Sequence, residues 1–119
     1  MSDTCPPINA EWLARMRSTK PKLLCTLFGI FLAEEPKRLA ELAEAITKGD
    51  HELARYHAHS LKGAAAVMGM DRLRDACRAL EFATKEIPCA ASDLADALTL
   101  VEHEAVMVFN IMRQHVPRA

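Results

Sequence analysis

This chain of 119 residues has little glycine, few aromatic residues and almost no net charge. Its four glycines form no cluster, and no Gly-x-x-x-x-Gly-Lys sequence is present, so no loop is available to hold the phosphates of ATP. The 15 basic and 16 acidic residues leave a net charge of −1, which gives no electrostatic reason to expect nucleic acid or an anionic membrane as a partner. These absences argue against an ATP-dependent kinase and against a nucleic-acid-binding protein.

Paired cysteines and long apolar runs are also missing. None of the four cysteines belongs to a Cys-x-x-Cys pair, so we expect reduced thiols, two or three of them packed, in a cytoplasmic protein. The chain does not begin with a basic segment followed by an apolar one, as a secretory signal would. The most apolar stretch, residues 23–33, is shorter than the roughly 20 residues of a membrane-spanning helix. We therefore expect no membrane insertion and a helical stretch buried on more than one side, with self-association through part of it as the alternative.

Half of the residues are hydrophobic, and they recur with a helical period in almost every segment, without a convincing strand. Asn9 can cap a short helix over about 10–17. Thr19 can cap the next, with a proline in its first turn, where a missing N–H does no harm. The apolar positions then keep one phase through Pro36, which predicts a single helix over about 20–48, bent at the proline. Two separate helices are the alternative, because a proline disfavours α geometry in the residue before it.

Capping and stop residues divide the rest of the chain into three more helices, bounded by Asp50 and Gly69, by Asp71 and Pro88, and by Ser92 and the residues near 115. Gly69 is expected to end its helix in the left-handed conformation. The last helix carries the seam of a helix bundle, with apolar spacings of four and three: Leu94, Leu98, Val101, Ala105, Val108 and Met112. The chain is therefore predicted to be one all-α domain over 1–119, an up-down-up-down four-helix bundle spanning about 20–115. The short extra N-terminal helix would lie across one end or side.

The third predicted helix would present an unusual set of side chains on one face. At about 100° per residue, three residues each fall within roughly 60° of His59: Lys62, Gly63 and Ala66. Two charged residues, Glu52 and Arg55, join this face one or two turns earlier. The opposite face is an apolar stripe fit for a core: Ala54, Ala58, Leu61, Ala65 and Met68. The histidine is therefore predicted to point into solvent.

If the chemistry at this face is phosphoryl transfer, each residue type on it has a physical role. An imidazole has a reference pKa near 6.5, so at neutral pH it is mostly a free base that can attack phosphorus without help from a second base. Lys62 offers a compact cation with three N–H donors to a phosphoryl group. Glycine inside a helix is about 1 kcal/mol less favourable than alanine, so Gly63 beside His59 indicates that a partner comes close to the backbone there.

Metal binding and simple packing are the alternatives for the histidines. His57 lies about 160° from His59 and is expected to pack at the edge of the core; residues two apart on a helix do not face each other, so this pair cannot share a metal ion. No His-x-x-x-His or Glu-x-x-His pair with a carboxylate shell is present, which argues against a metal or haem site. The other charged residues of interest are assigned to the solvated surface: Glu34, Glu81, Arg72, Arg74 and Arg78. For the three arginines the alternative is that one or more of them helps to dock a partner.

The run His59-Ser60-Leu61-Lys62-Gly63, followed by Gly69, resembles the signature of the histidine phosphotransfer (HPt) domains of multistep two-component signalling. The similarity extends to segments on both sides: residues 31–39 and Gly49-Asp50 upstream, and Leu73, Cys77 and Leu80-Glu81 downstream. It covers roughly residues 20 to 112. The chain departs from many members at three positions after the motif, where they carry glycine or small polar residues: Ala64, Ala66 and Val67.

This resemblance implies a phosphorelay carrier. His59 would accept a phosphoryl group from the phosphoaspartate of a receiver domain and pass it to the aspartate of another receiver, with Lys62 beside it. The docked receiver would contact five further residues: Glu52, Arg55, Ser60, Gly63 and Ala66. The alternative is a pseudo-HPt adaptor that binds receiver domains without being phosphorylated.

The resemblance also implies the partners. They would be response-regulator receiver domains and a sensor histidine kinase, which could be a hybrid kinase. This chain would bind no cofactor, the receiver would bring Mg²⁺, and the protein would act as a phosphohistidine intermediate without ATP-dependent kinase activity of its own. We expect a monomer rather than a dimer, and the start at Met1 favours a free-standing protein over a domain of a hybrid kinase.

Overall fold

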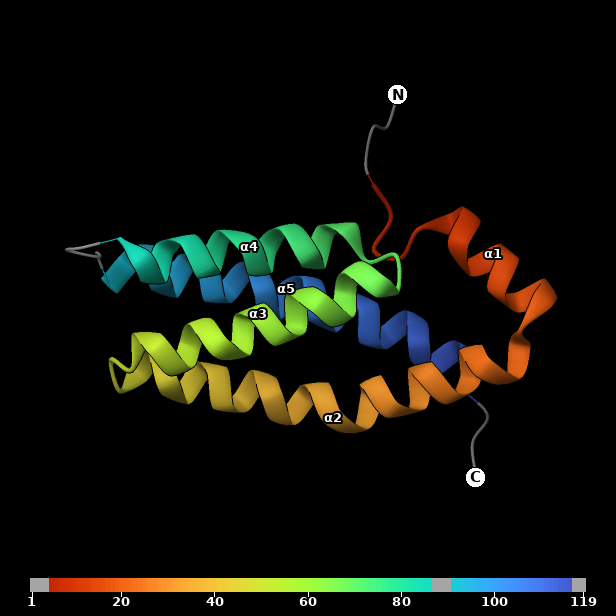
Figure 1. Ribbon diagram of the computed structural model, residues 1–119, viewed down its shortest axis with the longest axis horizontal. Coiled ribbons are helices and arrows are strands. Elements are labelled where there is room, and N and C mark those ends of the chain that lie inside the picture. Colours follow the sequence, from red (N-terminus) through yellow and green to blue (C-terminus); the bar gives the residue numbers. More distant parts are fainter. Residues whose placement is uncertain (1–4, 87–90, 117–119) are drawn as a thin grey trace.

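The computed structural model describes residues 5–86 and 91–116, and within these ranges the chain forms helices and no strands. The helices are α1 (Ala10–Thr19), α2 (Pro21–Thr47), α3 (His51–Val67), α4 (Asp71–Lys85) and α5 (Ala91–His115) (Figure 1). The prediction of an all-α fold is confirmed.

The four long helices form a closed ring of neighbours. α2 packs against α3 and α5, and α4 packs against the same two helices. Successive helices run in opposite directions, which gives the predicted up-down-up-down bundle (Figure 1). The short helix α1 packs against α2 and lies at the end of the bundle where α3 turns into α4. This arrangement leaves one side of α3 uncovered along most of its length.

The helix starts test the capping predictions. Asn9 and Asp50 cap α1 and α3 as predicted, each accepting a backbone hydrogen bond from the residue three positions later. The prediction that Thr19 caps α2 is wrong, because Thr19 ends α1 and its hydroxyl donates to the Arg15 carbonyl. Asp71 is the first residue of α4 and makes no capping hydrogen bond. The predicted stop at Pro88 lies outside the described residues.

α2 is one continuous helix that contains Pro36, so the prediction of a single helix is confirmed over the alternative of two. In its first half, Leu24 and Phe28 are buried, whereas Leu23 is 44% and Ile30 55% exposed. The stretch 23–33 is therefore buried on one side and open on the other, so the expectation that it is buried on more than one side is wrong. Over the described part of the chain, no helix combines the length and apolar character needed to cross a membrane.

The core is built around the apolar stripe of α3. All five predicted residues of this stripe are buried: Ala54, Ala58, Leu61, Ala65 and Met68. Large side chains of the facing helices fill the space around them, including Phe28, Leu42, Leu73, Leu80, Val101 and Met112. Because most of the stripe is alanine, the neighbouring helices can approach α3 closely. The stripe fixes the rotation of α3 and turns His59 outward.

The Arg72 side chain links two helices of the bundle. The assignment of Arg72 to the solvated surface is wrong, because its guanidinium pairs with Glu104 of α5, with Nε 3.0 Å from Oε1, and links α4 to α5.

The cysteines within the described residues are free thiols: Cys5 is exposed, Cys25 half-buried and Cys77 buried. Burial raises the pKa of the Cys77 thiol to about 12, so this thiol stays protonated at neutral pH. Cys89 lies outside the described residues.

Gly69 ends the turn after α3 in the left-handed conformation, with φ of +71°, as predicted. Its carbonyl also accepts a hydrogen bond of 2.7 Å from the Asn9 N–H, which attaches the start of α1 to this turn. A β-carbon at Gly69 would lie 3.2 Å from the Asn9 Cβ and 3.3 Å from the Trp12 Cγ. The position therefore requires glycine for both its backbone angle and its neighbours.

We expect Gly69→Ala to lower the free energy of unfolding by about 1–3 kcal/mol, because a left-handed alanine is strained and its methyl group crowds α1. Urea denaturation followed by circular dichroism measures the change. Gly29→Ala is the matched control: Gly29 lies inside α2 with no neighbouring atom within 4 Å of an added β-carbon. This control should leave stability unchanged or raise it. Equal stability of Gly69→Ala and the wild type would contradict the prediction.

Candidate functional site

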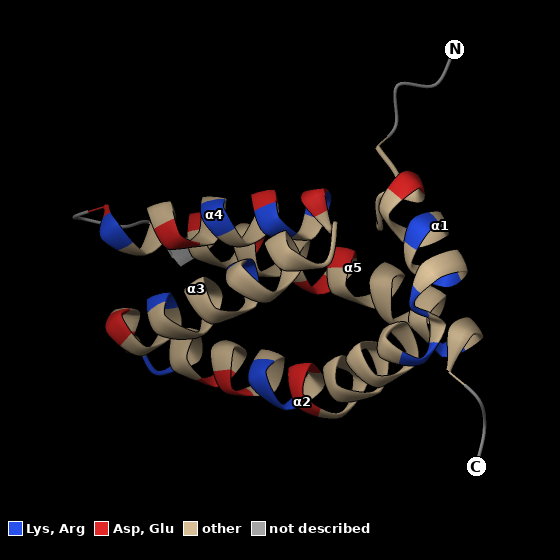
Figure 2. Ribbon diagram, turned by 45° about the vertical axis from the view of Figure 1, so that its right-hand side comes forward, with Lys and Arg blue, Asp and Glu red and all other residues tan. Residues whose placement is uncertain are grey.

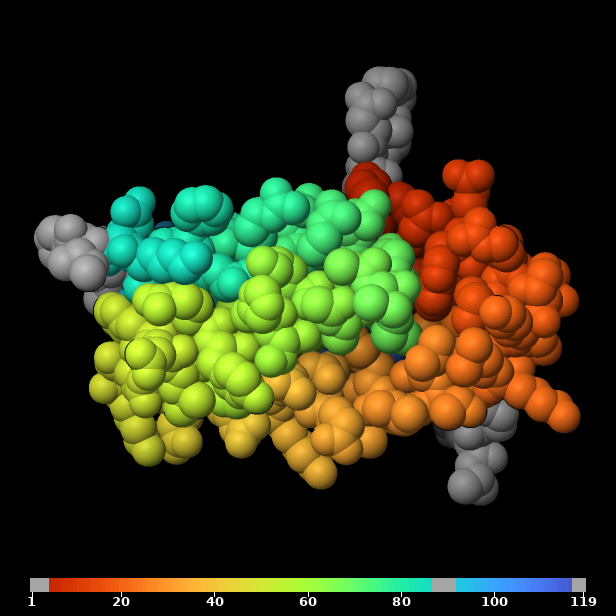
Figure 3. Space-filling view, viewed as in Figure 1, coloured from red at the N-terminus to blue at the C-terminus, as the bar shows by residue number. Residues whose placement is uncertain are grey.

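The candidate site lies on the exposed side of α3, between α2 and α4 (Figure 3). The His59 side chain is 69% exposed, which confirms that it points into solvent. Gly63 and Ala66 are exposed on the same side, one and two turns further along the helix. Glu52 is exposed near the start of α3, and Ser60 is half-buried. The helix therefore brings the predicted residues into one row.

Glu81 of α4 is a central member of this site, and its assignment to the solvated surface is wrong. Only 8% of the residue is exposed, because it lies on the side of α4 that faces α3. One carboxylate oxygen, Oε2, lies 3.0 Å from the His59 Nδ1, and the other, Oε1, lies 2.6 Å from the Lys62 Nζ. The sequence could have predicted that Glu81 is buried, since it follows Cys77 by four residues and so lies on the same buried face of α4.

The two hydrogen-bond donors keep Glu81 ionised. Burial on its own would raise the pKa of the Glu81 carboxyl, but hydrogen bonds from Lys62 and His59 outweigh burial and lower it overall. An ionised carboxylate can only accept hydrogen bonds. The His59 Nδ1 must therefore carry the proton, and in the neutral ring the free electron pair is on Nε2. This nitrogen lies on the edge of the ring away from Glu81.

Lys62 occupies a different position from the one expected. The sequence predicts an unoccupied cation beside the imidazole, but the Lys62 side chain is only 26% exposed and its ammonium contacts Glu81. An ammonium has three N–H donors, so this contact leaves others for a second acceptor. In this arrangement Lys62 first of all stabilises the carboxylate that holds His59.

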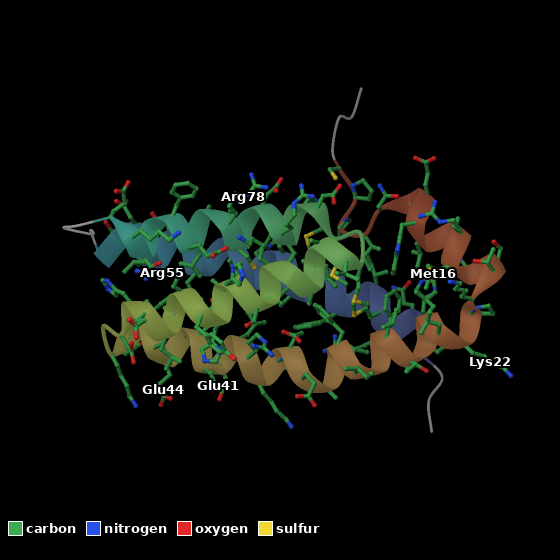
Figure 4. All side chains as sticks on the ribbon, in the orientation of Figure 1. Met16, Lys22, Glu41, Glu44, Arg55 and Arg78 are labelled. Carbon is green, nitrogen blue, oxygen red and sulfur yellow. The ribbon has the colours of Figure 1, made fainter. Side chains whose placement is uncertain are left out.

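Arg55, which is predicted to contact a docked receiver, also makes hydrogen bonds within its own fold. Its Nε donates to the Thr84 Oγ1 and its Nη2 to the Thr84 carbonyl, both at 3.1 Å. The side chain thus reaches from α3 across to the last turn of α4 (Figure 4). Arg55 is half-buried and is already engaged with its own fold.

Sequence reasoning assigned no place in the site to two exposed apolar residues on the same side of α3 as the histidine. Tyr56 is 61% and Val67 76% exposed, and both fall on the outward side of α3. Between them Gly63 leaves the backbone bare, and a β-carbon added there would meet no neighbouring atom within 4 Å. We call the set Tyr56, His59, Gly63, Ala66 and Val67 the docking face. The helical period could have found both residues, since each lies within about 80° of His59.

Charged side chains and metal-binding side chains are sparse on the docking face. α3 carries few charged residues beyond its first turns, whereas acidic and basic residues alternate along the outer side of α4 (Figure 2). Nowhere in the described ranges do three His, Cys, Asp or Glu side chains gather closely enough to hold a metal ion. The chemistry available at the docking face is that of one oriented imidazole.

Comparisons with known proteins agree with this fold and give its family. The family model described as Hpt domain matches residues 26–107. The chain is also similar to the crystal structure of histidine-containing phosphotransfer protein B (HptB) from Pseudomonas aeruginosa PAO1, with a TM-score of 0.81 and 24% sequence identity. That likeness covers 93% of this chain and 95% of the other and supports the fold. No curated protein matches the chain. Since the family match spans well over half of the sequence, the chain belongs to the Hpt domain family.

Proposed function

We propose that this protein is a phosphorelay carrier that takes a phosphoryl group onto the Nε2 of His59 from the phosphoaspartate of a receiver domain. It then passes the group to the aspartate of another receiver. One observation carries the proposal: the imidazole is exposed, and its Nδ1 is held by the buried Glu81 carboxylate, so that Nε2 is the free nucleophile.

The transfer step follows from this arrangement. The Nε2 electron pair attacks phosphorus in line, a nitrogen–phosphorus bond forms, and the bond between phosphorus and the aspartate oxygen breaks to release a carboxylate. The ring keeps its proton on Nδ1 and becomes positively charged. Glu81 stabilises that charge through its existing hydrogen bond of 3.0 Å. Because acyl phosphates and phosphohistidines are both reactive, the step runs in either direction.

The remaining requirements fall on the partner. A loose transition state for phosphoryl transfer needs alignment and neutralisation of charge, and this chain contributes the nucleophile and the donors of Lys62. The receiver would supply Mg²⁺ and most of the other groups. Its surface would lie on the docking face, with Tyr56 and Val67 as apolar contacts and Gly63 as the point of closest approach. Glu52 and Ser60 would lie at the margins of this contact. The receivers would belong to a cytoplasmic relay that begins at a sensor histidine kinase.

Direct label transfer tests the proposal. The purified protein is mixed with receiver domains carrying labelled phosphoaspartate and with Mg²⁺, and the label is then located by peptide mapping. We expect acid-labile, base-stable label on His59, and loss of that label when an unphosphorylated receiver is added. Receivers that bind the protein but lose their label only to water would instead indicate an adaptor.

Gly63→Leu is expected to slow phosphoryl uptake about tenfold or more without unfolding the bundle. The added side chain would project from the docking face and displace the receiver from in-line geometry. The structure has open space around Gly63, and leucine favours the helix more than glycine, so stability should not fall. Uptake rates and thermal denaturation measure the two effects. Ala95→Leu, at an exposed position of α5, is the matched control; normal uptake by Gly63→Leu would refute the close approach.

A further inference from the structure

We propose that Arg55 is a positioning residue, which acts through Thr84 to hold the Glu81 carboxylate at His59. The role is distinct from the receiver contact that its place on α3 suggested. It rests on the proposed function for its effect on transfer, but its effect on the histidine ring is a property of the isolated protein.

A continuous chain of hydrogen bonds connects these residues. Arg55 donates to both the hydroxyl and the carbonyl of Thr84, each at 3.1 Å. The same Thr84 hydroxyl donates to the Glu81 carbonyl at 2.6 Å. The Glu81 side chain then meets His59 and Lys62. α3 therefore contacts α4 at two points one helical turn apart, at Thr84 and at Glu81. Glu81 takes part in both, because its carbonyl bonds to Thr84 and its carboxylate contacts α3 directly.

The end of α4 needs such a connection. The last four carbonyl groups of a helix have no N–H partner within it, and cationic side chains can satisfy them. α4 ends at Lys85, so the Thr84 carbonyl is one of these groups, and the Arg55 guanidinium supplies its partner. Without that partner the last turn is expected to loosen. Glu81 lies three residues earlier, and its carbonyl accepts a hydrogen bond from the hydroxyl of the same threonine.

Burial separates this role from docking. Thr84 is only 2% exposed, so no partner protein can touch it. A change at Thr84 can therefore affect transfer only from within the fold, whereas a change at Arg55 could act in either way. The pair of positions gives a clean test.

The test compares Arg55→Met with Thr84→Val. Methionine keeps the apolar stem of the arginine without its donors, and valine keeps the shape of threonine without its hydroxyl. We expect each variant to take up phosphoryl groups about threefold to tenfold more slowly, because the imidazole is less well oriented. The double variant should be no slower than the slower single one, since both changes break the bond from the Arg55 Nε to the Thr84 Oγ1.

A second readout needs no receiver. Nitrogen-15 NMR of the unphosphorylated protein, at a pH where the imidazole is neutral, reports how the ring proton is divided between Nδ1 and Nε2 of His59. We expect the wild type to keep the proton on Nδ1, and both variants to have a measurably larger share on Nε2. The NMR result does not depend on phosphoryl uptake. The positioning role of Arg55 and the proposed function can therefore be refuted separately.

Two controls complete the design. Thr84→Ser keeps the hydroxyl and should behave as the wild type, which also guards against loss of folding as the cause. Arg78→Met removes a surface guanidinium of α4 whose nearest acidic partner is 4.0 Å away, and it should leave the His59 spectrum unchanged. A slow Arg55→Met alongside a normal Thr84→Val, with unaltered His59 tautomers in both, would overturn the proposal and assign Arg55 to docking.

Discussion

Replacing His59 by glutamine is expected to abolish phosphoryl uptake and leave the bundle folded. The amide of glutamine has no basic nitrogen, so it cannot form the nitrogen–phosphorus bond on which the transfer depends. Loss of the nucleophile should reduce the rate by about 10³-fold or more, down to the background of hydrolysis. The side chain is 69% exposed and lies outside the core, so its replacement removes little packing. Label transfer and circular dichroism measure the two effects.

The control for this variant is His103→Gln. His103 is an exposed histidine of α5, on a helix that makes no part of the docking face. It should take up label at the rate of the wild type. An adaptor that is never phosphorylated would behave differently, because His59→Gln would then bind receivers and support signalling unchanged. Label remaining on the His59→Gln protein would place the phosphorylated residue elsewhere.

Glu81→Gln is expected to slow phosphoryl uptake by about 10- to 100-fold, by analogy with the loss of a carboxylate that orients a metal-binding histidine. A neutral amide can donate as well as accept, so it no longer forces the ring proton onto Nδ1. It also stabilises the positive ring less well after Nε2 has been phosphorylated. Uptake kinetics and the NMR tautomer measurement test the two reasons separately. Wild-type values in both would refute the role of Glu81.

The same variant should also reveal a pH dependence of stability. The folded state lowers the pKa of Glu81 below its unfolded value, so the ionised carboxylate stabilises the fold. This contribution is fully present above about pH 5 and is lost as the pH falls through the lowered pKa. We therefore expect Glu81→Gln to be less stable than the wild type by about 1–3 kcal/mol near neutral pH, with the difference shrinking in acid. Glu102→Gln, at an exposed site of α5, should give no such pattern.

Much of the fold could be predicted because its signals are local. The capping groups of Asn9 and Asp50, the phase that continues through Pro36 and the left-handed Gly69 each depend on a few adjacent residues, and the structure contains all of them. The prediction for Thr19 is wrong for a related reason, since a threonine hydroxyl can cap a following helix or bond to the preceding turn. The chain here chooses the preceding turn, at Arg15.

The pairings across helices could not be predicted in the same way. The sequence pattern places Glu81 and Arg55 toward solvent or a partner, yet each is committed to the contact between α3 and α4. Such a contact depends on how two helices are rotated and how far each is shifted along its axis. Segments distant in sequence set that register through core residues such as Leu61, Leu73 and Leu80.

The sequence by itself therefore determined the class of fold and which side of α3 faces outward, because an apolar stripe on one side leaves His59 and Gly63 on the other. Only the tertiary structure decided which ring nitrogen of His59 is free and what Lys62 and Arg55 hold. The reason is that a helical period is a property of one segment, whereas hydrogen bonds between α3 and α4 exist only once the core has fixed both helices in place.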